Sequence, residues 1–227
     1  MWKLNDKTDK LGFAVWSDTH GSVTFGGPGG AGGIGVFRDD QNSLADADRL
    51  FRFETVDDSR FPNAAEHFVR GKQLHVHYPQ ADEQFGIRIQ AQPIHSTASH
   101  IVLELAIAVE TDSLDLHPKV DLVTDAGLSR DLQVSELSGK GGAPGVSFST
   151  TDDATTAILL GPHDAPFTAD QSTKEQVRLR LFGDFLEKGV IRKARPWLVI
   201  DRDGSMTDSQ LHKLWNELMA SPLPLTA

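Results

Sequence analysis

The chain has 227 residues, of which 39% are apolar and 24% charged, and its formal net charge is −10. This composition is typical of a folded protein, and the acidic balance is unfavourable for nucleic-acid binding, which needs a basic face. Cysteine is absent from the sequence, which excludes thiolate zinc sites and cysteine nucleophiles.

The first half of the chain predicts a series of short strands, because apolar residues alternate with polar ones in several segments. The segment 26–35, which follows the first two of these strands, carries seven glycines in ten positions and is expected to form an irregular loop. The polar, acidic segment 36–48 is expected to stay on the surface. The strands expected in this half are 11–17, 22–25, 50–56, 73–78 and 85–92.

The clearest strand of the sequence is 100–112, HIVLELAIAVETD. Large aliphatic side chains occupy every second position: Ile101, Leu103, Leu105, Ile107 and Val109. In an extended strand these side chains all point to one face. Because Glu104 and Glu110 lie on the opposite face, we expect a central strand that is buried mainly on one side.

The second half of the chain repeats this pattern. Strands are expected at 119–123, 131–137, 146–150 and 154–160. The segment 176–200 is expected to form a β-hairpin with a turn at its EKG sequence. Pro196 lies in the return strand, and it has no N–H group to donate. We therefore expect it to face an unpaired edge or a bulge.

One helix is predicted, over Thr207–Met219. Thr207 and Gln210 have the spacing of a capping box, which satisfies backbone N–H groups at the start of a helix. The residues that follow at helical spacing form one apolar stripe: Leu211, Leu214, Trp215 and Leu218.

About a dozen short strands with polar turns predict an all-β fold, a large antiparallel β-sandwich with one C-terminal α-helix. A single domain over 1–227 is favoured, because the strand at 98–112 is long for a small sheet. Two small sandwiches that meet near 125–145 are the alternative.

His75 and His77 are candidate metal ligands, because residues i and i+2 of a strand share a face and two imidazoles there could bind one metal ion. Together with Gly71, Glu83 and Gly86, they resemble the first motif of cupins, a double-stranded β-barrel family. That resemblance implies metal binding by the two histidines. The histidine of the second cupin motif is missing from this sequence.

Three further motifs are explained more simply as turns or loops. SDTHG at 17–21 resembles the first metal-binding motif of metallophosphoesterases, which would make Asp18 and His20 ligands, but the other motifs of that family are missing or misplaced. The segment 201–210 is similar to the second half of an EF-hand calcium loop and lacks its first and last ligands. GAGGIG at 30–35 matches the dinucleotide fingerprint without a helix after it. No cofactor is therefore expected.

Candidate ligand-binding residues are His163, Asp164 and Trp197. His163 and Asp164 lie in a proline-bounded loop at 161–167, and binding residues often lie on loops. Trp197 is a candidate because sugar-binding sandwiches present exposed aromatic side chains. The chain has only one Tyr and four Trp, which favours a protein partner over a carbohydrate.

No complete catalytic set is found, so the sequence favours a non-catalytic β-sandwich that binds a protein or a carbohydrate. The alternative is an enzyme, either metal-dependent or analogous in architecture to the aldose-epimerase supersandwich, that uses His75, His77 or His163 with nearby acids. A structural subunit that pairs through the edge strand near Pro196 is a third hypothesis, unless the C-terminal helix covers that edge. Without an apolar stretch long enough for a signal peptide or a membrane span, a cytoplasmic location and no membrane partner are expected.

Overall fold

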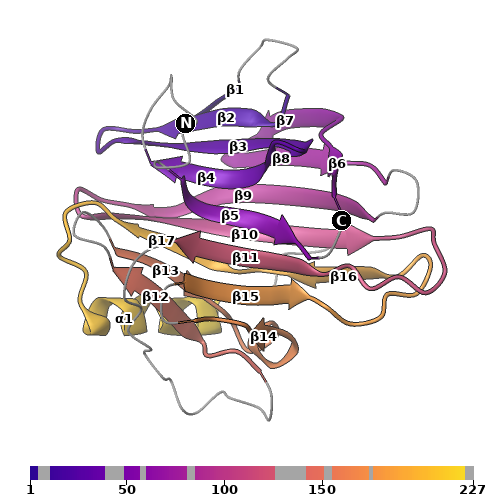
Figure 1. Cartoon of the computed structure of the whole chain (residues 1–227). Helices are drawn as coiled ribbons and strands as arrows, with labels where there is room; N and C mark the ends of the chain where they lie inside the picture. The colour runs from indigo at the N-terminus through magenta and orange to yellow at the C-terminus, as the bar shows by residue number, and fades with distance from the viewer. Residues whose placement is uncertain are drawn as a thin grey trace.

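A computed structural model of the chain contains two antiparallel β-sheets and one α-helix (Figure 1). It describes residues 1–4, 11–38, 49–56, 60–80, 85–125, 142–150, 155–173 and 176–222. The predicted fold class, an antiparallel β-sandwich with a C-terminal helix, is confirmed.

One sheet, called sheet A here, has nine strands in the described part of the chain. In spatial order, eight of them are β1 (Trp2–Leu4), β2 (Phe13–Ser17), β3 (Ser22–Gly30), β4 (Gly33–Arg38), β5 (Arg49–Thr55), β11 (Val120–Asp125), β15 (Gln176–Phe182) and β14 (Ala169–Asp170). The ninth, β6 (Phe61–Asn63), pairs with β3.

The other sheet, sheet B, has eight strands in the described part. In spatial order, seven of them are β12 (Val146–Thr150), β13 (Thr155–Leu159), β17 (Trp197–Asp201), β10 (His100–Glu110), β9 (Gly86–Ser96), β8 (Gln73–Tyr78) and β7 (Glu66–Arg70). The eighth, β16 (Ile191–Ala194), pairs with β10 beyond the end of β17.

Strand β10 is the predicted central strand, and its alternation is confirmed. The five aliphatic side chains at its odd positions are at most 1% exposed and lie in the core between the sheets. Burial of one such side chain stabilises the fold by about 1.5–3 kcal/mol. Val102, on the opposite face of β10, packs in a second apolar cluster under the helix.

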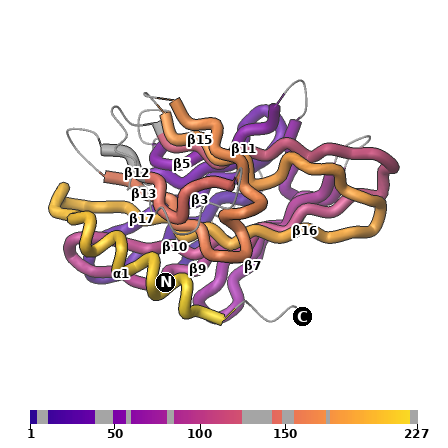
Figure 2. The backbone as a smooth tube through the Cα atoms, turned by 90° about the horizontal axis from the view of Figure 1, so that it is seen from below, coloured from indigo at the N-terminus to yellow at the C-terminus, as the bar shows by residue number. Residues whose placement is uncertain are grey.

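Helix α1 (Asp208–Ala220) covers the outer face of sheet B. Figure 2 shows sheet B between α1 and strands β5, β11 and β15 of sheet A. The predicted capping box is present, because the Gln210 N–H donates to Thr207 Oγ1 at 3.3 Å and the Thr207 N–H donates to Gln210 Oε1 at 2.8 Å. The whole predicted stripe is buried, and Trp215 Nε1–H donates to the Leu160 carbonyl at 3.0 Å.

The glycine-rich segment forms strands, so the prediction of an irregular loop at 26–35 is wrong. It builds most of the β3–β4 hairpin, where the absence of side chains permits very close packing. The Tyr78 hydroxyl donates to the Gly27 carbonyl at 2.8 Å, and a Cβ atom at Gly27 would lie 2.2 Å from that hydroxyl oxygen. Gly29, with φ of +72°, lies so close to β6 that its Cβ would be 2.0 Å from the Pro62 carbonyl oxygen.

The prediction that 36–48 lies on the surface is also wrong for two residues of this segment that the structure describes. Val36 and Phe37 are buried within β4. Residues 39–48 lie outside the described part of the chain, as does the strand expected at 131–137.

The segment 176–200 is not a hairpin. Strand β15 pairs with β11 and β14 in sheet A, whereas β16 and β17 pair with β10 in sheet B. Residues 183–190 therefore connect the two sheets. The Leu105 N–H donates to the Pro196 carbonyl at 3.0 Å, so Pro196 faces central strand β10 rather than an edge. The hairpin was predicted from a local sequence pattern, but these strands pair with segments that are distant in the sequence, such as β10 and β11.

Four short strands, β1, β6, β7 and β14, were not expected from the sequence. Strands β1, β6 and β14 have at most three residues, too few for a periodic pattern, and β7 has no buried side chain that would mark one face. Both sheets combine strands from the two halves of the chain. This mixing supports the single domain over 1–227, which stays a prediction. In the described residues, α1 is too short and too polar to span a membrane.

We expect Trp215→Ala to lower the free energy of unfolding by about 3–5 kcal/mol, because it removes a large buried side chain by which α1 packs on sheet B. Urea unfolding measures this change. Asn216→Ala, on the exposed side of the same helix, is the control and should change it by less than about 0.5 kcal/mol. Equal effects of the two substitutions would contradict this packing.

Candidate functional site

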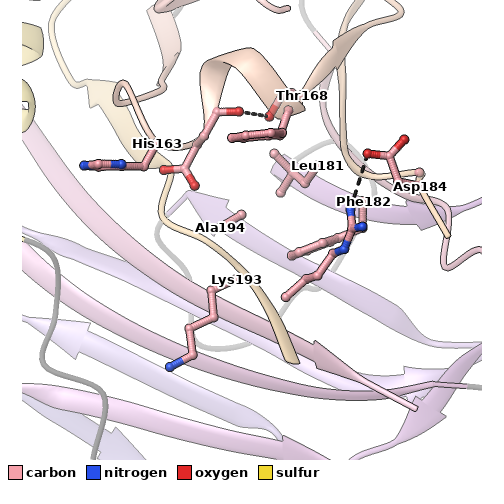
Figure 3. Close-up of a pocket in the computed structure, with 11 residues that line it drawn as sticks. His163, Thr168, Leu181, Phe182, Asp184, Lys193 and Ala194 are labelled. Carbon is pink, nitrogen blue, oxygen red and sulfur yellow. Dashed lines mark hydrogen bonds and ion pairs between the residues drawn. The ribbon is translucent and has the colours of Figure 1, made fainter. Parts of the chain in front are cut away.

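His163 and Asp164 line a pocket with a volume of about 390 Å³. The pocket lies between the short 3-10 helix η3 (Ala165–Phe167), the end of β15 and strand β16 (Figure 3). Leu181, Phe182 and Ala194 form its buried apolar wall. The structure thus brings two of the three predicted ligand-binding residues to one pocket.

The loop that carries His163 and Asp164 is held by backbone hydrogen bonds. The Asp164 N–H donates to the Gly161 carbonyl at 3.1 Å, and the Ala143 N–H donates to the carbonyls of Ala165 and Thr168 at 3.0 and 2.8 Å. The Thr168 hydroxyl donates to the Asp164 carbonyl at 2.9 Å. These bonds fix the backbone on both sides of the Asp164 side chain.

Asp164 is a buried acid, with 8% of its surface exposed. Burial raises the pKa of its carboxyl group, and the backbone N–H and the charge of Arg195 offset that rise only in part. His163, its neighbour, is exposed. The carboxyl group of Asp164 would gain from a ligand that donates a hydrogen bond or carries positive charge.

The rim of the pocket is partly apolar and partly basic. Phe167 is 72% exposed, which is unusual for a large apolar side chain. Lys193 is exposed, and its amine points away from Leu181 in Figure 3. Arg192 is half-buried and forms an ion pair with Asp184 at 3.3 Å. Phe167 ends the loop that carries His163, whereas Lys193 lies 26 positions later in the sequence, so no local pattern connected the two segments.

The expected exposure of Trp197 is not found. Its side chain is 3% exposed, lies in the cluster under α1, and donates its indole N–H to Glu104 Oε2 at 2.8 Å. The strand alternation that places its neighbour Leu198 in the core between the sheets directs Trp197 to the outer face, where the helix covers it. The other three Trp and Tyr78 are also buried.

His75 and His77 lie on β8 and do not line this pocket. The His75 ring stacks on Phe68 with ring centroids 4.7 Å apart, and its Nε2 atom is buried without a hydrogen-bond partner in the described residues. Burial, with the charge of Arg70, lowers the pKa of His75. In the described residues, no group of three or more His, Asp or Glu is placed to hold a metal ion. The two-histidine metal site stays a prediction.

The other metal-like motifs form turns. In the 17–21 segment, Asp18 accepts a hydrogen bond from the His20 N–H at 2.7 Å. In the calcium-like segment, Asp201 accepts from the N–H groups of Asp203 and Met206 at 3.3 and 2.9 Å, which leads the chain into α1. Both arrangements agree with the turns expected from the sequence.

Comparison with known proteins gives little further information. No protein family and no curated protein matches the chain. One solved structure with a similar fold is "Putative kojibiose phosphorylase from human microbiome", with 12% sequence identity and a TM-score of 0.45. The match covers 92% of this chain and 32% of that protein, so this chain spans about a third of its length. A likeness at this level carries no argument about function.

We expect Asp164→Asn to change how stability depends on pH. A carboxyl group whose pKa is raised in the folded state stabilises the fold below its ordinary pKa of 3.8, and this contribution is lost as pH rises through the folded pKa. Asparagine does not titrate. The stability of the variant relative to the natural protein, measured by urea unfolding, should therefore increase as pH rises above 3.8.

The matched control for this comparison is Asp170→Asn, at an exposed position of β14. Its stability should follow that of the natural protein across the same pH range. Parallel curves for Asp164→Asn and the natural protein would contradict the raised pKa.

Proposed function

We propose that the protein is a non-catalytic binding module that captures an extended segment of a partner protein by strand addition to β16. The observation that carries this proposal is the outer edge of β16, which pairs with no other strand in the described residues and borders the 390 Å³ pocket. Strand addition is a common mode of peptide recognition, because the peptide satisfies the unpaired backbone groups of an edge strand.

The direction of the backbone groups follows from the pairing of β16 with β10. Leu105 and Pro196 lie opposite each other, and the Leu105 N–H donates to the Pro196 carbonyl. The register between β10 and β17 continues unchanged into the pairing of β10 with β16. Backbone groups alternate in direction along a strand. Those of Ala194 and Arg192 therefore point to β10, and those of Lys193 and Ile191 point to the outer edge. Helix α1 packs on the face of sheet B, and none of its residues lines the pocket at this edge.

The side chains near the edge favour a segment that alternates apolar and acidic residues. Val190 and Ile191 are 41% and 48% exposed, and Phe167 lies across the pocket from β16. Lys188 and Lys193 supply positive charge in a chain whose net charge is −10. An acidic side chain of the partner would be attracted to these two lysines. A second copy of β16 would instead bring like charges together, which disfavours pairing between identical edges.

The burial of all four Trp and of the only Tyr supports a protein partner over a carbohydrate. A carbohydrate remains the second candidate on one observation, the combination of Asp164 with the exposed ring of Phe167 in a single pocket. A carboxylate accepts hydrogen bonds from sugar hydroxyls, and an aromatic face packs against a sugar ring.

We expect Lys193→Pro to weaken capture of an extended peptide. Proline removes an N–H that points to the outer edge, so the hydrogen bonds between β16 and β10 are kept. Peptides selected from a displayed random library on the natural protein should alternate apolar and acidic residues. Their affinity, measured by titration calorimetry, should fall at least about tenfold in this variant.

Lys193→Ala is the matched control, because it removes the charge and keeps the backbone N–H. It should weaken the same peptides by less than the proline variant does. Equal losses in the two variants would show that only the charge matters, which contradicts strand addition.

If the protein instead binds a carbohydrate, we expect Phe167→Ala rather than Lys193→Pro to remove binding. Binding on a glycan array would be lost in Phe167→Ala, which removes the exposed ring, and kept in Lys193→Pro. If the natural protein binds peptides and gives only background signal on the glycan array, the carbohydrate alternative is rejected. Self-association of the natural protein that disappears in Lys193→Pro, seen by native mass spectrometry, would instead assign the edge to a homo-oligomer.

A further inference from the structure

A second pocket lies at the other end of β10, between the two sheets. Its volume is about 180 Å³. Val23 of sheet A and Ile101 and Ile200 of sheet B contribute apolar side chains to its walls, and three side chains that can carry positive charge also line it: His20, Arg38 and Arg202. This pocket is separate from the edge of β16 and from the proposed partner site.

Arg202 has an unused hydrogen-bond donor. Its Nη1 donates to the Thr97 carbonyl at 2.9 Å, which holds the guanidinium group in place. Its Nη2 is buried and has no hydrogen-bond partner in the described residues. A buried charged donor without a partner is costly, and an acceptor brought by a ligand would remove that cost.

The acids near Arg202 do not satisfy this donor. Asp201 is fully buried, and its two carboxylate oxygens accept from the backbone N–H groups of Asp203 and Met206. Asp18 and Asp203 are exposed to solvent, where water and salt screen their charges. Asp18 also accepts a hydrogen bond from the His20 backbone.

We propose that this pocket binds a small aliphatic carboxylate, whose carboxylate group meets Arg202 and Arg38 and whose hydrocarbon part lies against Ile101 and Ile200. A guanidinium group can donate two parallel hydrogen bonds to a carboxylate. An inorganic oxyanion would use the arginines and leave the apolar walls without a contact. The walls therefore favour an anion with a short hydrocarbon chain.

Titration calorimetry of the full chain with acetate, propionate and butyrate, at constant pH and ionic strength, tests this proposal. Affinity should increase by about fourfold for each added methylene group that is buried. Arg202→Gln should weaken butyrate by at least about tenfold, because one charge-assisted interaction is lost. Arg88→Gln is the control, since Arg88 pairs with Glu110 and does not line the pocket.

Because Arg202 also holds the Thr97 loop, its variant could fold poorly. Arg38 is exposed, so Arg38→Gln should fold normally and weaken butyrate several-fold. Absence of butyrate binding up to 10 mM (about 3 kcal/mol of binding free energy) would overturn the proposal. Equal binding of butyrate, acetate and inorganic phosphate would also overturn it, since the apolar walls would then have no role.

Discussion

The fold depends on the two faces of β10. One face supplies five aliphatic side chains to the core between the sheets, and the other packs Val102 against the cluster that α1 covers. On that outer face, Glu104 accepts the indole N–H of Trp197 and lies 3.7 Å from a guanidinium nitrogen of Arg195. A charged residue is therefore tolerated in the middle of the central strand because Trp197 of β17 and Arg195, which lies between β16 and β17, pair with it. The far side of β16, next to the pocket, pairs with no strand in the described part of the chain.

Features that depend on local pattern were predictable from the sequence. The alternation of β10, the capping box at Thr207 and the apolar stripe of α1 are all expressed within a few residues. The glycine-rich segment was not predictable in this way, because glycine is usual both in loops and where backbones approach closely. Contacts such as Gly27 with Tyr78 and Gly29 with Pro62 decide between these two roles, and these partners lie 51 and 33 positions away in the sequence.

The candidate site was predictable in part. His163 and Asp164 follow from the composition of their loop, and both line the pocket. The role of Trp197 was not predictable, because alternation indicates which residues share a face but not what covers that face. The unpaired edge of β16 was not predictable for a related reason. Its sequence is consistent with a hairpin to β15, and the structure instead places the two strands in different sheets.

The order of strands in sheet B has a consequence for how the chain folds. Strand β17, close to the C-terminus, lies between β10 and β13, which are made earlier. During synthesis the centre of this sheet stays incomplete until residues 197–201 have emerged, and until then one edge of β10 has no strand beside it. Folds dominated by pairing between distant segments form slowly. A nascent chain that stops before residue 197 would expose a long aliphatic strand, so premature termination carries a high risk of aggregation.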